Sequence, residues 1–206
     1  MKLLAAGFLG VAYSQCKGFC EDTDYFGDGE LNDCSNRGNI NAEIFLSYGR
    51  ASGDTLGPWG DDRAAGPITF NEPVSFFGNQ YNDFYWSTNG LMTFGTAMTS
   101  YNNNPFPIDG QALFSPFWTD LRLSDDEGDI GSEYDRGVIY ARELQEDLDV
   151  ASQMIRYELD YPSFQANQGA VVTWKDIRFY DQENLDRKNT FQAIFHRCRK
   201  FLTEQK

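Results

Sequence analysis

Short hydrophobic runs with a period of two fill the chain between Ala42 and Phe195. Alternation of apolar and polar residues is typical of strands that bury one face. Glycine, proline and asparagine separate the runs at short intervals, as in all-β sandwiches and barrels. The pattern predicts a mainly β domain, an antiparallel β-sandwich, over residues 42–196, with strands near 68–76, 113–123, 137–142, 170–180 and 190–195.

One run, YNDFYWSTNGLMTFG from Tyr81 to Gly95, contains the dipeptide Asn89-Gly90. Both residues accept positive φ, so the dipeptide predicts a tight β-hairpin. Folding the run at this point places four large side chains on one face: Phe84, Trp86, Met92 and Phe94. The preceding strand has the same character, with Ile68, Phe70, Val74 and Phe76 on one face.

One segment departs from the period of two. Acidic residues come first in it, where the dipole of a helix favours them, and five apolar residues then recur at helical spacing: Leu144, Leu148, Ala151, Ile155 and Leu159. A strand could instead bury Ile155, Tyr157, Leu159 and Tyr161. We predict one α-helix over 145–159, because the helical spacing is sustained for longer.

The first fourteen residues have the features of a secretory signal peptide. Lys2 precedes an apolar run, and the small residues Ala12 and Ser14 place a cut before Gln15. The run is shorter than the ~20 apolar residues that span a bilayer. We therefore expect a signal peptide over 1–14, a short Cys-bearing segment over 15–41 and a basic tail over 197–206. The protein is expected to be secreted and extracellular, without membrane insertion.

The net charge of −14 restricts the partners of the protein. Lysine and arginine are nowhere clustered as neutralisation of a phosphate backbone requires, which argues against nucleic acid as a partner. The same charge argues against adsorption to anionic lipid.

Four cysteines, Cys16, Cys20, Cys34 and Cys198, are candidates for disulfides, since a secreted chain folds in an oxidising compartment. Three pairings are possible. We expect two of the first three cysteines to pair locally and the third to reach Cys198. Zinc is the alternative, but the spacing of Cys16 and Cys20 is long for a zinc knuckle and no histidine lies nearby.

The segment Asp22–Asp33, DTDYFGDGELND, imitates an EF-hand calcium loop. Phe26 and Gly29, however, occupy positions that need a ligand and an apolar anchor. A loop rich in Asx turns and closed by disulfides is the alternative interpretation. We predict no cofactor, with calcium as the open alternative here and in the acidic loops 124–135 and 181–189.

Catalytic classes can be tested by inventory. His196 is the only histidine and no G-x-S-x-G elbow occurs, which argues against Ser-His-Asp, Cys-His and two-histidine zinc chemistry. A glycosidase would need two carboxyls ~5–10 Å apart, and Asp120 with Asp83 or Asp109 could supply them. Exposed tryptophans could also stack on sugar rings, the candidates being Trp59, Trp86 and Trp118. Sugar binding or hydrolysis is therefore the alternative to a non-enzymatic module.

The segment FSPFWTDL, Phe114–Leu121, sets one carboxylate in an apolar context. Asp120 could be a catalytic acid with a raised pKa, a metal ligand or a structural hydrogen-bond acceptor. With no partner base in sequence and no metal-ligand spacing, we interpret it as an acceptor for N–H or hydroxyl groups near Asn89-Gly90, because a buried unpaired carboxylate is costly.

Six motifs in order resemble the extracellular nidogen-type (NIDO) domain of nidogens, alpha-tectorin and membrane mucin and sushi-domain proteins. They are GDTLGPWGDD, PVSFFGNQYNDFYWSTNGLMTFG, ALFSPFWTDL, GVIYAR, AVVTWKDIRFY and NTFQAIF. The resemblance implies an extracellular module of matrix and cell-surface proteins, linked with cell–matrix adhesion and without catalytic or cofactor-binding residues. Its partners would be matrix or cell-surface proteins.

The resemblance implies a structural role for thirteen of the family's motif positions: Phe76, Phe77, Gly78, Asn89, Gly90, Phe94, Pro116, Phe117, Trp118, Asp120, Trp174, Phe191 and Gln192. The chain departs from the family after the strand NTFQAIF, which ends at Phe195: a further strand is expected there, but HRCRKFLTEQK follows. This departure predicts an exposed sheet edge, a liability for pairing and aggregation.

Overall fold

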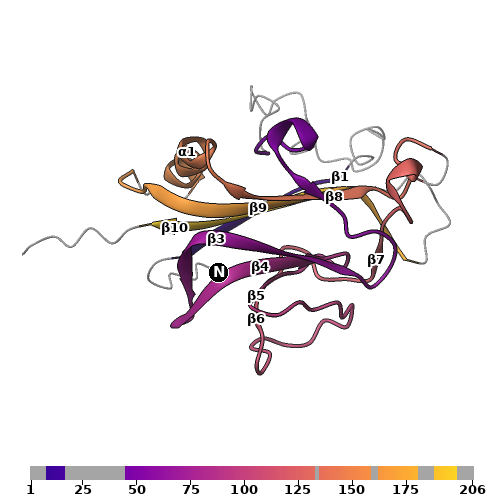
Figure 1. Ribbon diagram of the computed structural model, residues 1–206, viewed down its shortest axis with the longest axis horizontal. Helices are drawn as coiled ribbons and strands as arrows, with labels where there is room; N and C mark the ends of the chain where they lie inside the picture. Colours follow the sequence, from indigo (N-terminus) through magenta and orange to yellow (C-terminus); the bar gives the residue numbers. More distant parts are fainter. Residues whose placement is uncertain (1–7, 17–44, 133–134, 159–161, 181–187, 199–206) are drawn as a thin grey trace, which may run out of the picture.

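The computed structural model describes residues 8–16 (as backbone), 45–132, 135–158, 162–180 and 188–198. Two antiparallel sheets lie one above the other, and a helix covers the outer face of the larger sheet (Figure 1). This arrangement confirms the predicted mainly β, sandwich-like fold with one α-helix.

The larger sheet has six strands. Its continuous path runs β1 (Phe8–Cys16), β10 (Asn189–Cys198), β9 (Ala166–Phe179), β8 (Val138–Leu144) and β2 (Thr55–Leu56), and β7 (Leu121–Arg122) pairs with β9 off this path. The smaller sheet has the order β3 (Ala64–Phe76), β4 (Asn79–Ser87), β5 (Met92–Phe94) and β6 (Ala112–Phe114). The helix α1 spans Leu148–Glu158, and two 3-10 turns span Arg50–Ser52 and Glu127–Asp129.

The main core lies between the two sheets. The hairpin register pairs Phe84 with Phe94 and Trp86 with Met92, so these four side chains share one face, as predicted. They pack against the inner face of the larger sheet, whose contribution comes from Ile139, Ala141, Ala170, Val172, Trp174, Ile177, Phe191, Ala193 and Phe195. Phe70, Val74 and Phe76 of β3 belong to the same cluster, and Ile68 packs against it. The period-two alternation therefore identifies the buried face correctly.

Helix α1 packs on the opposite face of the larger sheet (Figure 1). Ala151 of the helix joins Val171 of β9 and Ile194 of β10 in a second cluster. Because β9 contributes Val172 to the first cluster and Val171 to the second, this central strand is buried on both faces. The helix begins three residues later than predicted, since β8 continues to Leu144.

One predicted strand, 113–123, is wrong as a continuous element. β6 ends at Phe114 and β7 covers only Leu121–Arg122, and residues 115–120 between them form no strand. The proline at 116 lacks the N–H that a ladder needs. The two halves also belong to different sheets, so the chain crosses from one layer to the other within this segment.

The end of β10 also differs from the prediction. The strand continues through His196 and Arg197 to Cys198, beyond the expected end at Phe195. Its outer edge is not exposed, because β1 pairs with it in antiparallel register from Phe8↔Arg197 to Cys16↔Asn189. The apolar segment expected to act as a signal peptide therefore supplies an edge strand.

Candidate functional site

Six of the thirteen motif residues lie where the turn 88–90 contacts the segment 115–121, a contact that we call the turn–segment junction: Asn89, Gly90, Pro116, Phe117, Trp118 and Asp120. Asn89 lies in the turn between β4 and β5 and is fully buried. Its side-chain Oδ1 accepts a hydrogen bond from the backbone N–H of Leu121 at 2.9 Å. Its backbone carbonyl accepts one from Thr119 at 3.4 Å. The turn therefore supplies acceptors to a segment that pairs with another strand only at its last residue, Leu121 of β7.

Gly90 determines how closely the two backbones approach. Its φ of 77° lies in the left-handed region, and a Cβ at this position would stand 1.9 Å from the carbonyl oxygen of Phe117. Only glycine fits such an approach, because a real Cβ atom would overlap the oxygen. The predicted hairpin at Asn89-Gly90 is thus confirmed, with a positive φ at Gly90 but not at Asn89, and the glycine also sets the packing of the junction.

Asn89 connects two further segments to the junction. Its Nδ2 donates to Oδ1 of Asp62 at 2.6 Å and to the carbonyl oxygen of Thr99 at 2.9 Å. Both donors and the acceptor of this buried amide are therefore satisfied, as the cost of burying a polar group requires. Loops far apart in the sequence are held together by one side chain.

Other motif residues use their polar atoms in the same way. The indole N–H of Trp174 donates to the carbonyl of Ser87 at 2.9 Å and so links the two sheets. The indole of Trp118 donates to Ser100 at 2.7 Å. The buried Gln192 accepts from the N–H of Leu46 at 2.9 Å and donates to Thr173 Oγ1 at 2.7 Å. These polar groups are occupied by internal hydrogen bonds.

The aromatic motif residues divide into buried and exposed members. Phe76 and Phe94 lie in the main core, and Phe191 stacks on Trp174 with ring centroids 4.8 Å apart. Phe117 is 38% exposed but packs its edge on Phe191. The remaining motif residues are Phe77 and Gly78, which form the positive-φ turn between β3 and β4, and the half-buried Pro116.

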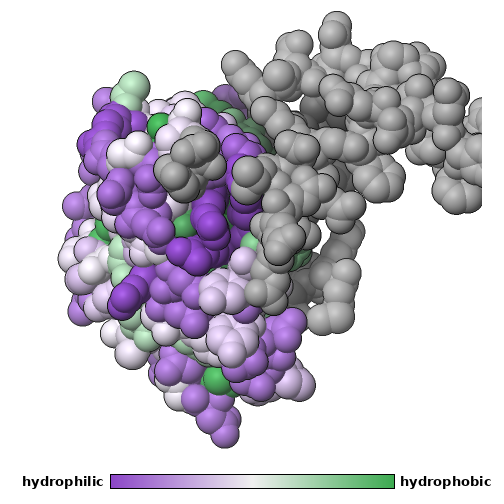
Figure 2. All heavy atoms as spheres, turned by 90° about the vertical axis from the view of Figure 1, so that its right-hand side faces the viewer, coloured by the Kyte–Doolittle hydropathy of each residue, from purple (hydrophilic) through white to green (hydrophobic). Residues whose placement is uncertain are grey.

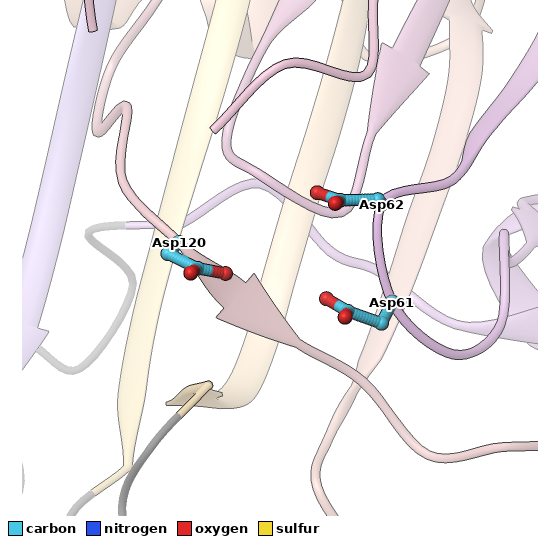
Figure 3. A group of neighbouring side chains, drawn as sticks. All are labelled: Asp61, Asp62 and Asp120. Carbon is cyan, nitrogen blue, oxygen red and sulfur yellow. The ribbon is translucent and has the colours of Figure 1, made fainter. Parts of the chain in front are cut away.

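Asp120 lies at the junction beside two further acids, as Figure 3 shows. Oxygen atoms of Asp61, Asp62 and Asp120 lie within 4.8 Å of one another. Burial and the charge of Asp62 raise the pKa of the Asp61 carboxyl, while Arg122 opposes the shift. Three close carboxylates are the kind of ligand set that a hard cation such as Ca²⁺ uses. The calcium interpretation of the sequence had pointed to other acids.

The acid pair proposed from the sequence, Asp120 with Asp83 or Asp109, stays a prediction. Neither Asp83 nor Asp109 belongs to the group around Asp120, which instead contains Asp61 and Asp62. These two residues stand in the GDTLGPWGDD motif, but no sequence spacing linked them to Asp120. The Asp62 carboxylate is already engaged by the Asn89 amide. The acceptor role assigned to the Asp120 carboxylate stays a prediction.

The tryptophans proposed to stack on sugars are mostly inside. Trp86 is 1% exposed and donates to the carbonyl of Gly57. Trp118 is 9% exposed, with Phe106 against its ring. Their assignment to sugar stacking is wrong, because neither ring presents a free face. Trp59 is half-buried and remains available for that test.

Several predicted features lie outside the described residues. They include Cys20, Cys34 and the calcium-like loop 22–33. Cys16 and Cys198 are described by their backbone, as the last residues of β1 and β10. The four cysteines and their pairing therefore stay predictions.

Comparison with known proteins decides the family. The sequence profile described as the nidogen-like domain matches residues 82–200, more than half of the chain. The chain belongs to the nidogen-like domain family. Human alpha-tectorin is 34% identical over 153 residues, which cover 72% of this chain and 7% of the relative. Drosophila melanogaster nidogen is 34% identical over 128 residues, 61% of this chain and 9% of the relative.

Mouse nidogen-2 is 28% identical over 167 residues, which cover 76% of this chain. This nidogen-like chain spans 11% or less of the length of these three relatives. No solved structure matches it significantly. Within the described residues, none of the helical segments has the length and apolar character to cross a membrane.

Proposed function

We propose that this nidogen-like chain is a secreted, non-enzymatic module of the extracellular matrix that supports cell–matrix adhesion. The observation that carries the proposal is the match of the family profile, joined by similarity to nidogens and alpha-tectorin. These relatives are extracellular matrix proteins. Its partners would be other matrix or cell-surface proteins.

The geometry of the junction supports a scaffold rather than a catalyst. Asn89, Trp118, Trp174 and Gln192 direct their polar atoms to backbone or side-chain groups of the same chain. A catalytic group must instead reach a substrate within hydrogen-bonding distance. The motif residues thus hold the sandwich together, and recognition of a partner would fall to the surface around them.

The surface supports a polar mode of binding. The end of the sandwich in Figure 2 is mainly hydrophilic, with isolated hydrophobic residues. Adhesive contacts of this kind are typical of non-obligate interfaces, whose overall polarity resembles that of the remaining surface. The strong negative charge would favour partners with basic patches and make association sensitive to salt.

The test compares two classes of ligand with one protein. The secreted chain is titrated onto cell-free matrix deposited by cultured cells and, in parallel, onto a glycan array. We expect saturable binding to the matrix and a flat glycan array. An unrelated protein of the same net charge is the control for non-specific electrostatic adsorption.

Trp59→Ala separates the two candidate functions, because this ring is the most accessible of the three tryptophans proposed for sugar stacking. Matrix binding should persist in the variant. Saturable glycan binding by the wild-type chain that disappears in the variant would instead establish carbohydrate recognition. A chain that binds neither ligand would refute the adhesive role.

A further inference from the structure

Among the described residues, the outer edge of β10 is covered by a single strand, β1. On one side β10 pairs with β9, and on the other it pairs with β1. The β1 register runs without a shift through nine residue pairs, from Phe8↔Arg197 to Cys16↔Asn189. The irregularities of β10 lie on its β9 side. The outer edge is therefore a regular ladder that accepts a straight antiparallel strand.

The sequence of β10 lacks the devices that protect a free edge. Exposed edge strands usually carry lysine, proline, a bulge or an inward-pointing charge, which prevent pairing with other chains. The strand reads NTFQAIFHRC, with neither lysine nor proline, and its only formal charge is Arg197, next to the last residue. Residues 191–196 are all buried. A strand of this composition is suited to pairing on both sides.

The strand that covers the edge carries the signal-peptide features. A cut before Gln15 would remove Phe8–Ser14 and leave only the pairs Gln15↔Thr190 and Cys16↔Asn189. This step rests on the proposed secretion of the chain. After such a cut, the backbone N–H and C=O groups that β10 directs toward β1 lose their partners, at a cost in free energy wherever water does not replace them.

We propose that the outer edge of β10 in the processed chain is a docking site for an extended strand of a partner protein. The strand would add antiparallel, through main-chain hydrogen bonds, in the place that β1 occupies in the unprocessed chain. The sequence of β1 defines its chemistry: FLGVAYS is uncharged and largely apolar. The docking site therefore fits an uncharged, apolar segment of about seven residues, extended at ~3.4 Å per residue.

A strand from another protein fits this edge better than a second copy. Pairing two copies through β10 would bring together two strongly acidic chains, since the net charge of −14 becomes more negative when the cut removes Lys2. Like charges of this size oppose association, whereas a neutral or basic partner avoids the repulsion. The proposal therefore commits to a different protein as the source of the strand.

The first measurement is the N-terminal sequence of the secreted chain, which we expect to begin at Gln15. The second uses two forms refolded in the same way, one beginning at Phe8 and one at Gln15. A labelled peptide FLGVAYSQ, copied from residues 8–15, is titrated into each. The control peptide has proline in place of Gly10 and Val11, so that at least one N–H facing β10 is lost.

We expect saturable binding of the first peptide to the Gln15 form, at least about tenfold tighter than to the Phe8 form, whose own strand competes at high effective concentration. The proline peptide should not bind. Hydrogen exchange of β10 amides in the Gln15 form should slow when the peptide binds.

Four results would overturn the inference. They are a secreted chain that keeps Phe8–Ser14, a Gln15 form that lacks cooperative unfolding, a cooperatively folded Gln15 form that ignores the peptide, and a Gln15 form that dimerises through β10. Matrix binding by the secreted chain is measured separately and would be unaffected by the first of these. Failure of the docking site and failure of the adhesive role are thus distinguishable.

Discussion

Buried polar groups are treated differently in two regions of this nidogen-like domain. At the turn–segment junction, the side chain of Asn89 is fully buried and makes three hydrogen bonds, to Leu121, Asp62 and Thr99. In β10, His196 is 1% exposed, and neither ring nitrogen has a hydrogen-bond partner among the described residues. The first group is compensated for its burial and the second is not.

The two regions differ in what their stability depends on. The junction joins four segments of the domain through the hydrogen bonds of the Asn89 side chain, all to groups of the same chain, so its stability needs nothing from outside. The β10 region depends on the neutral form of one imidazole and on the strand that covers its edge. We therefore expect the junction to determine whether the domain folds, and the β10 region to determine under which conditions it stays folded.

Gly90→Ala should have the largest effect, because it forces the junction apart. The new Cβ would meet the carbonyl oxygen of Phe117 at 1.9 Å, and the residue would also keep a positive φ. We expect a loss of more than ~4 kcal/mol of unfolding free energy, or failure of secretion. Chemical denaturation of the purified variant, or its secreted yield, measures the loss.

Gly78→Ala is the matched control for Gly90→Ala. Gly78 has a similar φ of 86°, but no atom lies within 4 Å of its added Cβ. It should cost only the ~1 kcal/mol of an unfavourable backbone conformation. Equal losses in the two variants would show that the close approach at the junction contributes nothing.

Asn89→Ala should cost slightly less. It leaves the N–H of Leu121 without its acceptor and removes both donors to Asp62 and Thr99. A buried donor left unsatisfied costs ~1–3 kcal/mol, and with the lost donors we expect about 3 kcal/mol in urea unfolding. Asn103→Ala, at an exposed position between β5 and β6, is the control and should change the unfolding free energy little. An Asn89→Ala variant with an unchanged unfolding free energy would refute the role of this side chain in holding the segments together.

The sequence predicts the fold well wherever the contacts are local. The alternation of β3 to β5, the Asn89-Gly90 turn and the spacing of α1 each depend on neighbouring residues, and each is confirmed. Pro116 is a local signal for the interruption between β6 and β7, but the path of this segment from one sheet to the other could not be predicted in the same way. It depends on an acceptor 32 positions away, the Asn89 side chain that bonds to Leu121.

The grouping of Asp61, Asp62 and Asp120 could not be predicted from local sequence either. Asp61 and Asp62 are 58 or more positions from Asp120 in the chain, and only the crossing of loops at the junction brings them together. The run 8–16 illustrates a different ambiguity. Its apolar character is suited both to a signal peptide and to an edge strand, and periodicity alone could not indicate its pairing with β10.

His196 should make the stability of the β10 region depend on pH. Burial lowers the pKa of its imidazole to about 4, from an ordinary value of 6.5. The folded state therefore favours the neutral ring: the stability is fully present above pH 6.5 and is lost as the pH falls toward 4. Between pH 7 and pH 5 the wild-type chain should lose about 2 kcal/mol through this group.

His196→Leu isolates this effect, because the leucine fills an apolar site and does not titrate. Its unfolding free energy, followed in urea from pH 7 to pH 5, should fall by about 2 kcal/mol less than that of the wild-type chain. The carboxylates titrate in both proteins and cancel in the difference. Parallel pH profiles would show that protonation of His196 does not destabilise the domain.

Asp120→Asn should have the smallest effect and is the sharpest test of what the acid at the junction does. As a structural acceptor, the carboxylate of Asp120 strengthens the hydrogen bonds that it receives, because charged acceptors bind more strongly than neutral ones. The isosteric amide should then cost about 1 kcal/mol of unfolding free energy and reduce secretion. Repulsion from Asp61 and Asp62, which lie within 4.8 Å, acts in the opposite direction. A stabilised variant would therefore mean that repulsion dominates and that the acceptor role is wrong.

The remaining alternative, that Asp120 is a metal ligand, is decided by melting both proteins in calcium and in EDTA. A calcium-dependent rise in the wild-type Tm that the variant loses would make Asp120 a metal ligand. Equal transitions in both buffers leave it as the acceptor that we expect.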